Sequence, residues 1–517
     1  MNSLLKTLFL PALLLAGNLS AETPLNYEGE LLGTAGKSDS GLAPYYIMSN
    51  NGGVVTQSKT LNFRAKAWKD LDLSRRFSYS FGADFVTGAA SEADYLRYDT
   101  QTGSLIPTGR KPAAIWLQQL YAEVKYRGVF LMAGMKERTS PLLNSSLGIG
   151  DYIQSNNARP VPEVRVGFVD FQDIPFTNGW VQIQGEISYG KYVQDNWMED
   201  HYNYYNQFIN TGVWTHYKRC YFRTKPSQPF SVTVGMQMYA QFGGTYTSYN
   251  KGKLTSEEHY DVKFKDFIDV FLPTRGGKGD NFSDTQYYLG NSLGSWDLVA
   301  RYRFRDNTEL KAYFQWPYED GSGIGKLNGF DGIWGLEYKN GNEKSPVANA
   351  VIEYVDFTNQ SGPTHWAPAD NPGSAMTGEA TGCDNYYNNS RYNSFMNFGM
   401  SQGTPFIPST IYNRNGVLQV ADNRIRGFHA GVSGNIIGNL DYRFLVSYRK
   451  SLGTYNSPRL KTADDTSFML EASYAFKQVK GLSLKGQFAM DRGNLLGDSY
   501  GVLVALKYDG ILNIFGK

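Results

Sequence analysis

The chain has 517 residues, 15% of them aromatic, and a formal net charge of +2. A charge this close to neutral argues against a nucleic-acid partner. The two cysteines, Cys220 and Cys383, cannot form a disulfide framework, and we expect both to be unpaired. No segment after residue 22 is long and apolar enough for a membrane helix, in agreement with a mean hydropathy of −0.42.

The first 21 residues resemble an export signal. Lys6 precedes an apolar run from Leu8 to Leu15, and Leu19-Ser20-Ala21 offers a small residue before a cleavage point at Glu22. The run is shorter than the roughly 20 residues that a membrane-spanning helix needs. We therefore predict a cleaved signal peptide at 1–21 and a single barrel domain at 22–517. The alternative is a buried helix of the folded domain.

Side chains alternate in character along much of the mature chain. Phe77, Tyr79, Phe81 and Phe85 alternate with serine, glycine and aspartate. This period of two indicates strands with two different faces. Tyrosine and phenylalanine form much of the apolar face, as expected where lipid covers one side of a strand and a polar lumen the other. A large periplasmic or secreted β-protein is the alternative.

Because only helices and closed barrels satisfy backbone hydrogen bonds in a membrane, many membrane strands imply a barrel. The sequence predicts an all-β protein, a transmembrane antiparallel β-barrel of about 18 strands with long extracellular loops. The predicted strands are 26–32, 61–71, 77–87, 115–126, 129–137, 164–169, 181–191, 213–223, 231–241, 296–304, 309–316, 332–338, 347–357, 426–434, 440–450, 467–476, 482–490 and 501–508.

The predicted connections are of two kinds. Some are tight, such as the hairpin at Arg127-Gly128 and the turn at 305–308. Others are long, polar and rich in aromatic residues. Short periplasmic turns and long outer loops are typical of outer-membrane barrels. The long connections are 88–112, 192–212, 242–286 and 358–425.

Two further segments stand apart from this pattern. Pro44 precedes Tyr45-Tyr46-Ile47-Met48 and an Asn-Gly pair follows, so we predict one short periplasmic helix within 41–53. The tail at 509–517 follows a well-alternating run. It fits either a final strand or a short plug.

No motif that we identify points to catalysis or to a metal. The five histidines are not at metal-ligand spacing, and the chain holds neither His-Glu-x-x-His nor Cys-x-x-Cys. We therefore expect no catalytic residue, no metal and no cofactor. An enzyme remains an alternative, because a catalytic site assembled across strands leaves no local motif.

Two long loops combine aromatic with hydrogen-bonding side chains. Residues 192–209 and 384–398 are rich in tyrosine and asparagine. Flat aromatic faces stack on sugar rings, while amide and charged groups bond to hydroxyls. The alternative is that these aromatic side chains only pack against one another. The candidate glycan-binding residues are Trp197, Tyr202, Tyr204, Tyr205, Tyr386, Tyr387, Asn388 and Arg391.

A second cluster lies at 156–165, where Pro160 and Pro162 predict a fixed bend that enters a strand. Its charges, together with a histidine in the aromatic and basic run 214–223, are candidates for the barrel lumen. A network of salt bridges that braces the barrel is one interpretation, and contact with a polysaccharide or a phosphate is the other. The residues are Arg159, Glu163, Arg165 and His216.

At these motifs the chain resembles the Wzi-type capsule-assembly family, with landmarks in the same order across essentially the whole mature chain. The landmarks include Gly134-Met135-Lys136-Glu137, Asn156-Asn157-Ala158-Arg159-Pro160, Ile174-Pro175-Phe176-Thr177-Asn178-Gly179-Trp180, Trp214-Thr215-His216, Asn385-Tyr386-Tyr387-Asn388 and Gly453-Thr454-Tyr455. The resemblance implies an outer-membrane barrel of about eighteen strands that binds capsular polysaccharide and helps to hold it on the cell surface. It implies a lectin and not a catalyst.

The sequence and the resemblance together predict a lectin-like protein in the outer membrane of a Gram-negative bacterium. We expect it to be a monomer surrounded by outer-membrane lipids, to bind capsular or other surface polysaccharide and to support capsule assembly and attachment. A channel for sugars or small solutes is the first alternative, because a barrel this wide leaves an aqueous pore if it is unplugged. An outer-membrane lipid hydrolase is the second.

Overall fold

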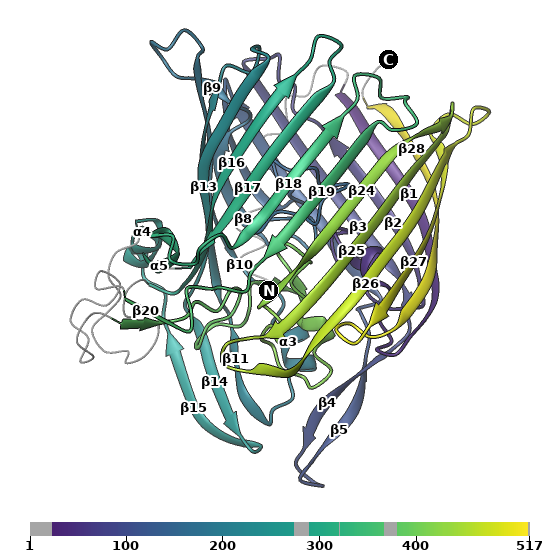
Figure 1. Cartoon of the computed structure of the whole chain (residues 1–517). Helices are drawn as coiled ribbons and strands as arrows, with labels where there is room; N and C mark the ends of the chain where they lie inside the picture. The colour runs from purple at the N-terminus through teal and green to yellow at the C-terminus, as the bar shows by residue number, and fades with distance from the viewer. Residues whose placement is uncertain (1–22, 273–288, 320, 367–379, 515–517) are drawn as a thin grey trace.

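A computed structural model describes residues 23–272, 289–319, 321–366 and 380–514. Its main element is a closed antiparallel barrel of 18 strands, and the two-residue strand β9 (Gln172–Asp173) is one further member of the sheet. Figure 1 shows the tilted strands of the barrel wall. The predicted barrel is confirmed, whereas the predicted signal peptide at 1–21 lies outside the described residues.

The barrel closes where its first and last strands meet. β1 (Thr23–Ser38) pairs with β28 (Ser499–Ile514) along its whole length. Residues 509–514 therefore belong to the last strand, while 515–517 lie outside the described residues. The other wall strands are β2 (Thr60–Lys69), β3 (Phe77–Ala90), β6 (Ile115–Tyr126), β7 (Val129–Met135), β8 (Glu163–Phe168), β10 (Val181–Lys191), β12 (Trp214–Thr224), β13 (Phe230–Phe242), β16 (Asn291–Arg303), β17 (Glu309–Tyr318), β18 (Gly332–Lys339), β19 (Asn349–Asp356), β24 (Ile425–Ile437), β25 (Leu440–Gly453), β26 (Pro458–Ala475) and β27 (Leu482–Gly493).

The wall strands turn apolar side chains outward and polar side chains inward. In β2, Leu61 and Phe63 are 57% and 48% exposed, whereas Asn62 and Arg64 are buried. A water-soluble β-protein buries its apolar face instead. The observed pattern fits a barrel with lipid outside and a polar lumen inside. It also explains why the alternation of side chains in the sequence predicted the wall strands.

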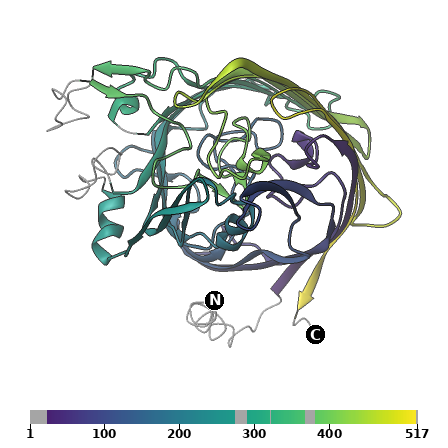
Figure 2. The ribbon, with the colours of Figure 1, turned by 90° about the horizontal axis from the view of Figure 1, so that it is seen from below.

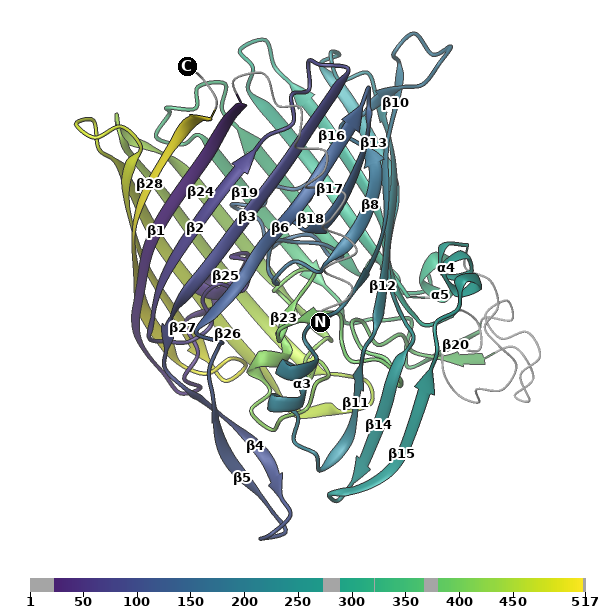
Figure 3. The same cartoon turned by 180° about the vertical axis from the view of Figure 1, so that it is seen from behind.

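The connections at the two ends of the barrel differ in length. Short turns such as Arg127-Gly128 lie at the end where β1 begins and β28 finishes. The opposite end, here called the outer end, carries long connections, some of which project as hairpins (Figures 1 and 3). Long loops of outer-membrane barrels face the cell exterior. The strands in these loops, which the sequence did not predict, are β4 (Ala93–Asp99), β5 (Ser104–Arg110), β11 (Asn206–Thr211), β14 (Gly244–Asn250) and β15 (Lys253–Tyr260).

Three outer connections, 39–59, 136–162 and 383–424, fold back into the barrel, and ribbons cross its interior in Figure 2. We call them the inward segments. The first carries helix α2 (Tyr45–Met48), whose four residues are all buried. The Tyr46 hydroxyl lies 2.9 Å from Nδ1 of His429 on the wall. The predicted short helix is therefore present, but its predicted periplasmic position is wrong, because its tyrosines pack inside the barrel at the outer end.

The second and third inward segments pack against each other and against the wall. Thr404 Oγ1 donates a hydrogen bond to the carbonyl oxygen of Ile149 (2.9 Å), and the rings of Tyr152 and Tyr387 lie 5.5 Å apart. The backbone N–H of Ile149 donates to Glu353 on β19 at 2.8 Å. Apolar residues of both segments form one cluster with side chains of the wall. The lumen is therefore occupied by protein at this level.

The remaining elements are short. No helix of the described residues is long and apolar enough to cross a membrane. Both cysteines are free, as expected from the sequence. These elements are α3 (Asp195–His201), α4 (Phe264–Phe271), α5 (Gly321–Ile324), the 3₁₀ helix η3 (Thr410–Tyr412), β20 (Thr364–Trp366), β21 (Ala380–Gly382), β22 (Met396–Asn397) and β23 (Met400–Ser401).

Candidate glycan-binding surface

The two tyrosines at the centre of the predicted glycan-binding loop lie inside the protein. Tyr386 and Tyr387 are both 0% exposed. The Tyr387 hydroxyl donates a hydrogen bond to the backbone carbonyl oxygen of Tyr152, and the Tyr386 hydroxyl accepts one from Asn328 Nδ2 at 2.7 Å. Burial raises the pKa of both phenols well above the ordinary value. Since both rings are covered by protein, the prediction that they stack on sugar is corrected to a packing role.

Asn388 and Tyr202 are buried for similar reasons. Asn388 Nδ2 donates to the carbonyl oxygen of Val420 (2.8 Å), and its Oδ1 accepts from the Val420 N–H (2.8 Å). The side-chain amide of Asn388 therefore forms hydrogen bonds with both backbone groups of Val420, as a neighbouring strand would. Tyr202 is 0% exposed and packs beside Met198 and Ile209. The predicted sugar contact of these two residues is corrected as well, because their polar atoms and ring faces are already engaged.

The other four predicted residues keep part of their surface open to solvent. Trp197, Tyr204, Tyr205 and Arg391 are all partly exposed. The Trp197 ring stacks on His201 of the same helix, with centroids 3.9 Å apart, and it also packs close to Gly399, so only part of the ring remains exposed. Partly exposed aromatic rings held by neighbours can bind a sugar face with little loss of side-chain entropy.

Aromatic and basic side chains alternate around helix α3. His201 lies between Trp197 and Tyr95, whose ring centroid is 4.8 Å away, and Cζ of Arg414 lies 4.6 Å from the Tyr95 ring centroid. Burial lowers the pKa of His201 to about 4. This histidine is therefore neutral near pH 7, and it acts there as a flat ring and not as a cation.

A cleft of about 450 Å³ opens at the outer end between α4 and the base of the β14–β15 hairpin. Arg391 lies on its border and donates to Glu258 Oε1 at 2.9 Å, which fixes the guanidinium near the Tyr246 ring. The cleft combines ring faces with hydrogen-bonding groups, which is the combination that a sugar needs. The sequence analysis identified Arg391 but not its neighbour Tyr392, and it missed the other lining residues because they come from a different connection. The lining includes Phe242, His259, Tyr260, Lys263, Arg391 and Tyr392.

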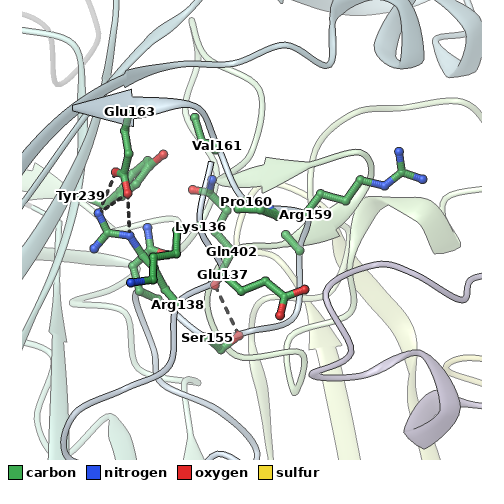
Figure 4. Close-up of a pocket in the computed structure, with 12 residues that line it drawn as sticks. Lys136, Glu137, Arg138, Ser155, Arg159, Pro160, Val161, Glu163, Tyr239 and Gln402 are labelled. Atoms are coloured by element: carbon green, nitrogen blue, oxygen red, sulfur yellow. Dashed lines mark hydrogen bonds and ion pairs between the residues drawn. The ribbon is translucent and has the colours of Figure 1, made fainter. Parts of the chain in front are cut away.

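Two of the predicted lumen residues belong to a network of buried charges. Arg138 pairs with Glu163 at 2.6 Å (Figure 4), and it also pairs with Glu186. Arg165 approaches the same two carboxylates only to 4.0 and 3.9 Å. The structure thus places Glu163 and Arg165 in an ion-pair network on the inner wall, where Arg138, which the sequence did not single out, is the central cation.

His216 lies on the other side of the wall. Its neighbour Tyr217 faces the lumen, where its hydroxyl donates to Gln237 at 3.0 Å, so the strand turns His216 outward. The imidazole stacks on Tyr189 at 4.5 Å and is covered by Phe271 of α4, which lies outside the barrel in Figure 3. The prediction that His216 lines the lumen is therefore wrong. Both faces of its strand hold aromatic and basic residues, so the sequence did not reveal which side faces inward.

Arg159 is separate from this network. Figure 4 shows its side chain extending away from the Arg138–Glu163 pair. Its guanidinium carbon lies 4.2 Å from the ring centroid of Trp116 and 4.6 Å from that of Phe398. Burial lowers the pKa of Arg159 to about 10. The sequence identified the arginine, but it could not identify two rings that come from distant positions in the chain.

No protein-family model matches the sequence, and no curated protein matches it either. Among solved structures, the chain is similar to Escherichia coli Wzi, described as a carbohydrate-binding β-barrel involved in group 1 capsule assembly. The two share 11% identity over 94% of this chain and 84% of that chain, with a TM-score of 0.54. Acinetobacter baumannii OccAB2 shares 9% identity over 95% and 98% of the two chains, with a TM-score of 0.48. Pseudomonas aeruginosa OprD shares 10% identity over 94% of this chain and 95% of that chain, with a TM-score of 0.42. The likeness to Wzi establishes the fold, an outer-membrane β-barrel.

Proposed function

We propose that this outer-membrane barrel is a lectin-like monomer, exported by a cleaved signal peptide, that binds capsular polysaccharide and supports its attachment to the cell surface. One observation carries the proposal. The outer cleft, with Arg391 fixed beside aromatic rings, lies at the end of a barrel whose lumen is occupied by the inward segments. A surface of this kind suits the capture of a polymer from outside.

Binding would rest on many weak contacts along one polymer. Ring faces of Trp197, Tyr204 and Tyr205 would stack on sugars, and Arg391 would donate to hydroxyl or carboxylate oxygens. Each contact is weak, but a repeating polymer engages many copies of the protein at once, which raises the overall affinity. The likeness in fold to a carbohydrate-binding barrel agrees with this proposal and does not carry it.

A solute channel is the second candidate, and one observation favours it. A polar cavity of about 190 Å³ remains between the inner wall and the second inward segment, lined by Arg138, Arg165 and Arg219 among others. Charged cavities of this kind can belong to a solute path. Purified protein in a planar bilayer distinguishes the two candidates. Steady single-channel conductance would support the channel, and a silent bilayer would support the lectin.

The lipid-hydrolase alternative finds no support in the described residues. Gly290-Asn291-Ser292-Leu293-Gly294, which the sequence analysis did not single out, has the spacing of a nucleophile elbow, and that motif requires a sharp turn between a strand and a helix. Here Ser292 is instead the second residue of wall strand β16 and lies opposite Ala240 of β13. Ser292 is therefore not at the turn between a strand and a helix where this motif places a catalytic serine.

The first experiment is a deletion of this gene in its own encapsulated host. Polysaccharide is measured on washed cells and in the medium, and the strain is complemented with wild type or with the variant Arg391→Gln. We expect normal synthesis with shedding in the deletion strain, restored by the wild type and not by the variant. Arg127→Gln, at a turn on the opposite end, is the matched control. Unchanged retention in the deletion strain would remove surface attachment as the function.

A further inference from the structure

Arg159 is held between two aromatic rings at the outer end of the barrel. Trp116 lies near the start of β6, Arg159 on the second inward segment and Phe398 on the third. All three side chains keep some contact with solvent. Asn397 Nδ2 donates to the carbonyl oxygen of Arg159 at 2.8 Å, which ties Phe398 and Arg159 together. The position of the guanidinium is therefore fixed by several parts of the chain.

The guanidinium N–H groups of Arg159, in contrast, have no hydrogen-bond acceptor among the described residues. Most other stacked arginines of the described residues do have one, and the exposed Arg127 is an exception. Arg391 donates to Glu258 (2.9 Å) and Arg449 donates to Asp465 (2.9 Å). Arg424 donates to a backbone carbonyl, that of Thr358, at 3.2 Å. Arg159 has neither an ion pair nor a side-chain hydrogen bond within the described ranges.

Both ring centroids lie within 4.6 Å of the guanidinium carbon, and the N–H groups at the edge of the guanidinium meet no acceptor of the described residues. Carboxylates bind arginine at this edge through two parallel hydrogen bonds. A partly desolvated cation without an acceptor is unfavourable, and an anionic ligand would remove that cost. The lowered pKa of Arg159, which comes from burial alone, agrees with an uncompensated cation.

The two acidic residues that border the same small cavity are already engaged, and Glu163 pairs with Arg138 at 2.6 Å. Glu137 accepts a hydrogen bond from Arg64 at 2.7 Å and another from Gln118 at 3.2 Å. It is not within ion-pair distance of Arg159, whose side chain extends away from the cavity in Figure 4. Gly53 lies behind Arg159, since a Cβ at this glycine would come within 3.4 Å of the arginine Cγ. The carboxylates of this cavity therefore do not compensate the charge of Arg159.

We propose that the Trp116–Arg159–Phe398 sandwich is a subsite for an acidic sugar, with the guanidinium edge of Arg159 binding the carboxylate of a uronic acid in the polysaccharide. This inference rests on the proposed function, because it names the class of glycan that the outer surface binds. Sugar rings that flank the acid would lie against the exposed edges of the two aromatic side chains.

The test uses the full-length protein in detergent and fragments of the surface polysaccharide of the producing bacterium. Fragments are used in native form and after chemical reduction of their carboxyl groups to alcohols. Binding is measured by titration calorimetry for wild type, Arg159→Gln, Arg159→Lys and the control Arg127→Gln. Heat-dependent migration on a gel checks that each variant has folded. If Arg159→Gln does not fold, Arg159→Lys carries the test, because it keeps the charge and loses the planar pair of donors.

We expect Arg159→Gln to weaken binding of the native fragments by about tenfold or more, and Arg159→Lys by less. Carboxyl reduction should weaken wild-type binding to a similar extent and abolish the difference between wild type and variant. Native fragments that bind wild type and Arg159→Gln equally would overturn the subsite and leave the proposed function standing. A loss in Arg159→Gln that persists with reduced fragments would overturn the assignment to a carboxylate. Fragments that do not bind wild type at all would contradict the proposed function itself.

Discussion

Asn157 donates a hydrogen bond from Nδ2 to the carbonyl oxygen of Ser401 at 2.9 Å and lies 3.0 Å from the Ser401 hydroxyl. Its Oδ1 accepts from the backbone N–H of Asn50 at 3.0 Å. One amide on the second inward segment therefore connects the first and the third. Asn157 is 0% exposed, so none of these bonds can be replaced freely by bulk water.

Asn157→Ala should loosen all three inward segments together. The substitution leaves the Asn50 N–H and the Ser401 carbonyl without this buried partner, and we expect a loss of about 1–3 kcal/mol in local stability. Hydrogen exchange of 45–58 and 396–411 measures it. The exposed turn variant Asn342→Ala should leave the exchange unchanged. Equal exchange in both variants would mean that the segments are held independently of this amide.

Tyr387→Phe should lower the free energy of unfolding without changing glycan binding. The variant keeps the ring in place and removes only the bond to the Tyr152 carbonyl oxygen, which costs about 1 kcal/mol. Thermal unfolding and fragment binding are measured on the same preparation. A variant that melts normally but no longer binds polysaccharide would show that this tyrosine contacts sugar after all.

Arg449→Met should destabilise the barrel strongly. The guanidinium is fully buried, pairs with Asp465 at 2.9 Å and stacks on Tyr45 of the first inward segment at 3.7 Å. Its removal leaves a buried carboxylate without its cation, and we expect a loss of about 3–5 kcal/mol in unfolding free energy. Urea unfolding in lipid vesicles checks this. The double variant with Asp465→Asn should recover part of the loss.

The surface pair of Arg492 and Asp498 provides the matched control for that experiment. The two side chains are 60% and 48% exposed, and pairs of this kind contribute about 0–1 kcal/mol. Arg492→Gln should therefore change the unfolding free energy little. A loss in Arg492→Gln as large as that in Arg449→Met would indicate that burial does not determine the effect.

Acidification should open the packing around His201. Its folded pKa is about 4, below the ordinary value of 6.5, so the folded state resists protonation while the unfolded loop accepts it. Stability is therefore complete above pH 6.5 and is lost as the pH falls toward 4, by about 3 kcal/mol at most. Hydrogen exchange of 195–203 should rise over this range. His201→Gln should remove the transition, and the exposed His259→Gln should retain it.

The barrel wall could be predicted from local pattern because each wall strand obeys the same local rule. A strand between lipid and a polar lumen must alternate, as Leu61, Asn62, Phe63 and Arg64 do, and this signal is visible without knowing which strand lies beside it. Short strands are no exception, since β8 was located from its own alternation together with the two prolines before it.

The inward segments and the outer cleft were decided only by tertiary structure. Tyr386 and Tyr204 both stand in loops rich in tyrosine and asparagine, yet Tyr386 is buried under Tyr152 and Tyr204 remains partly exposed beside Arg97. Their difference arises from partners far along the chain. Loop residues have no fixed period, so the sequence does not show which side of the loop is buried. It shows only that an aromatic side chain can bind a sugar or pack against another ring. The contacts of the folded chain determine which of the two it does.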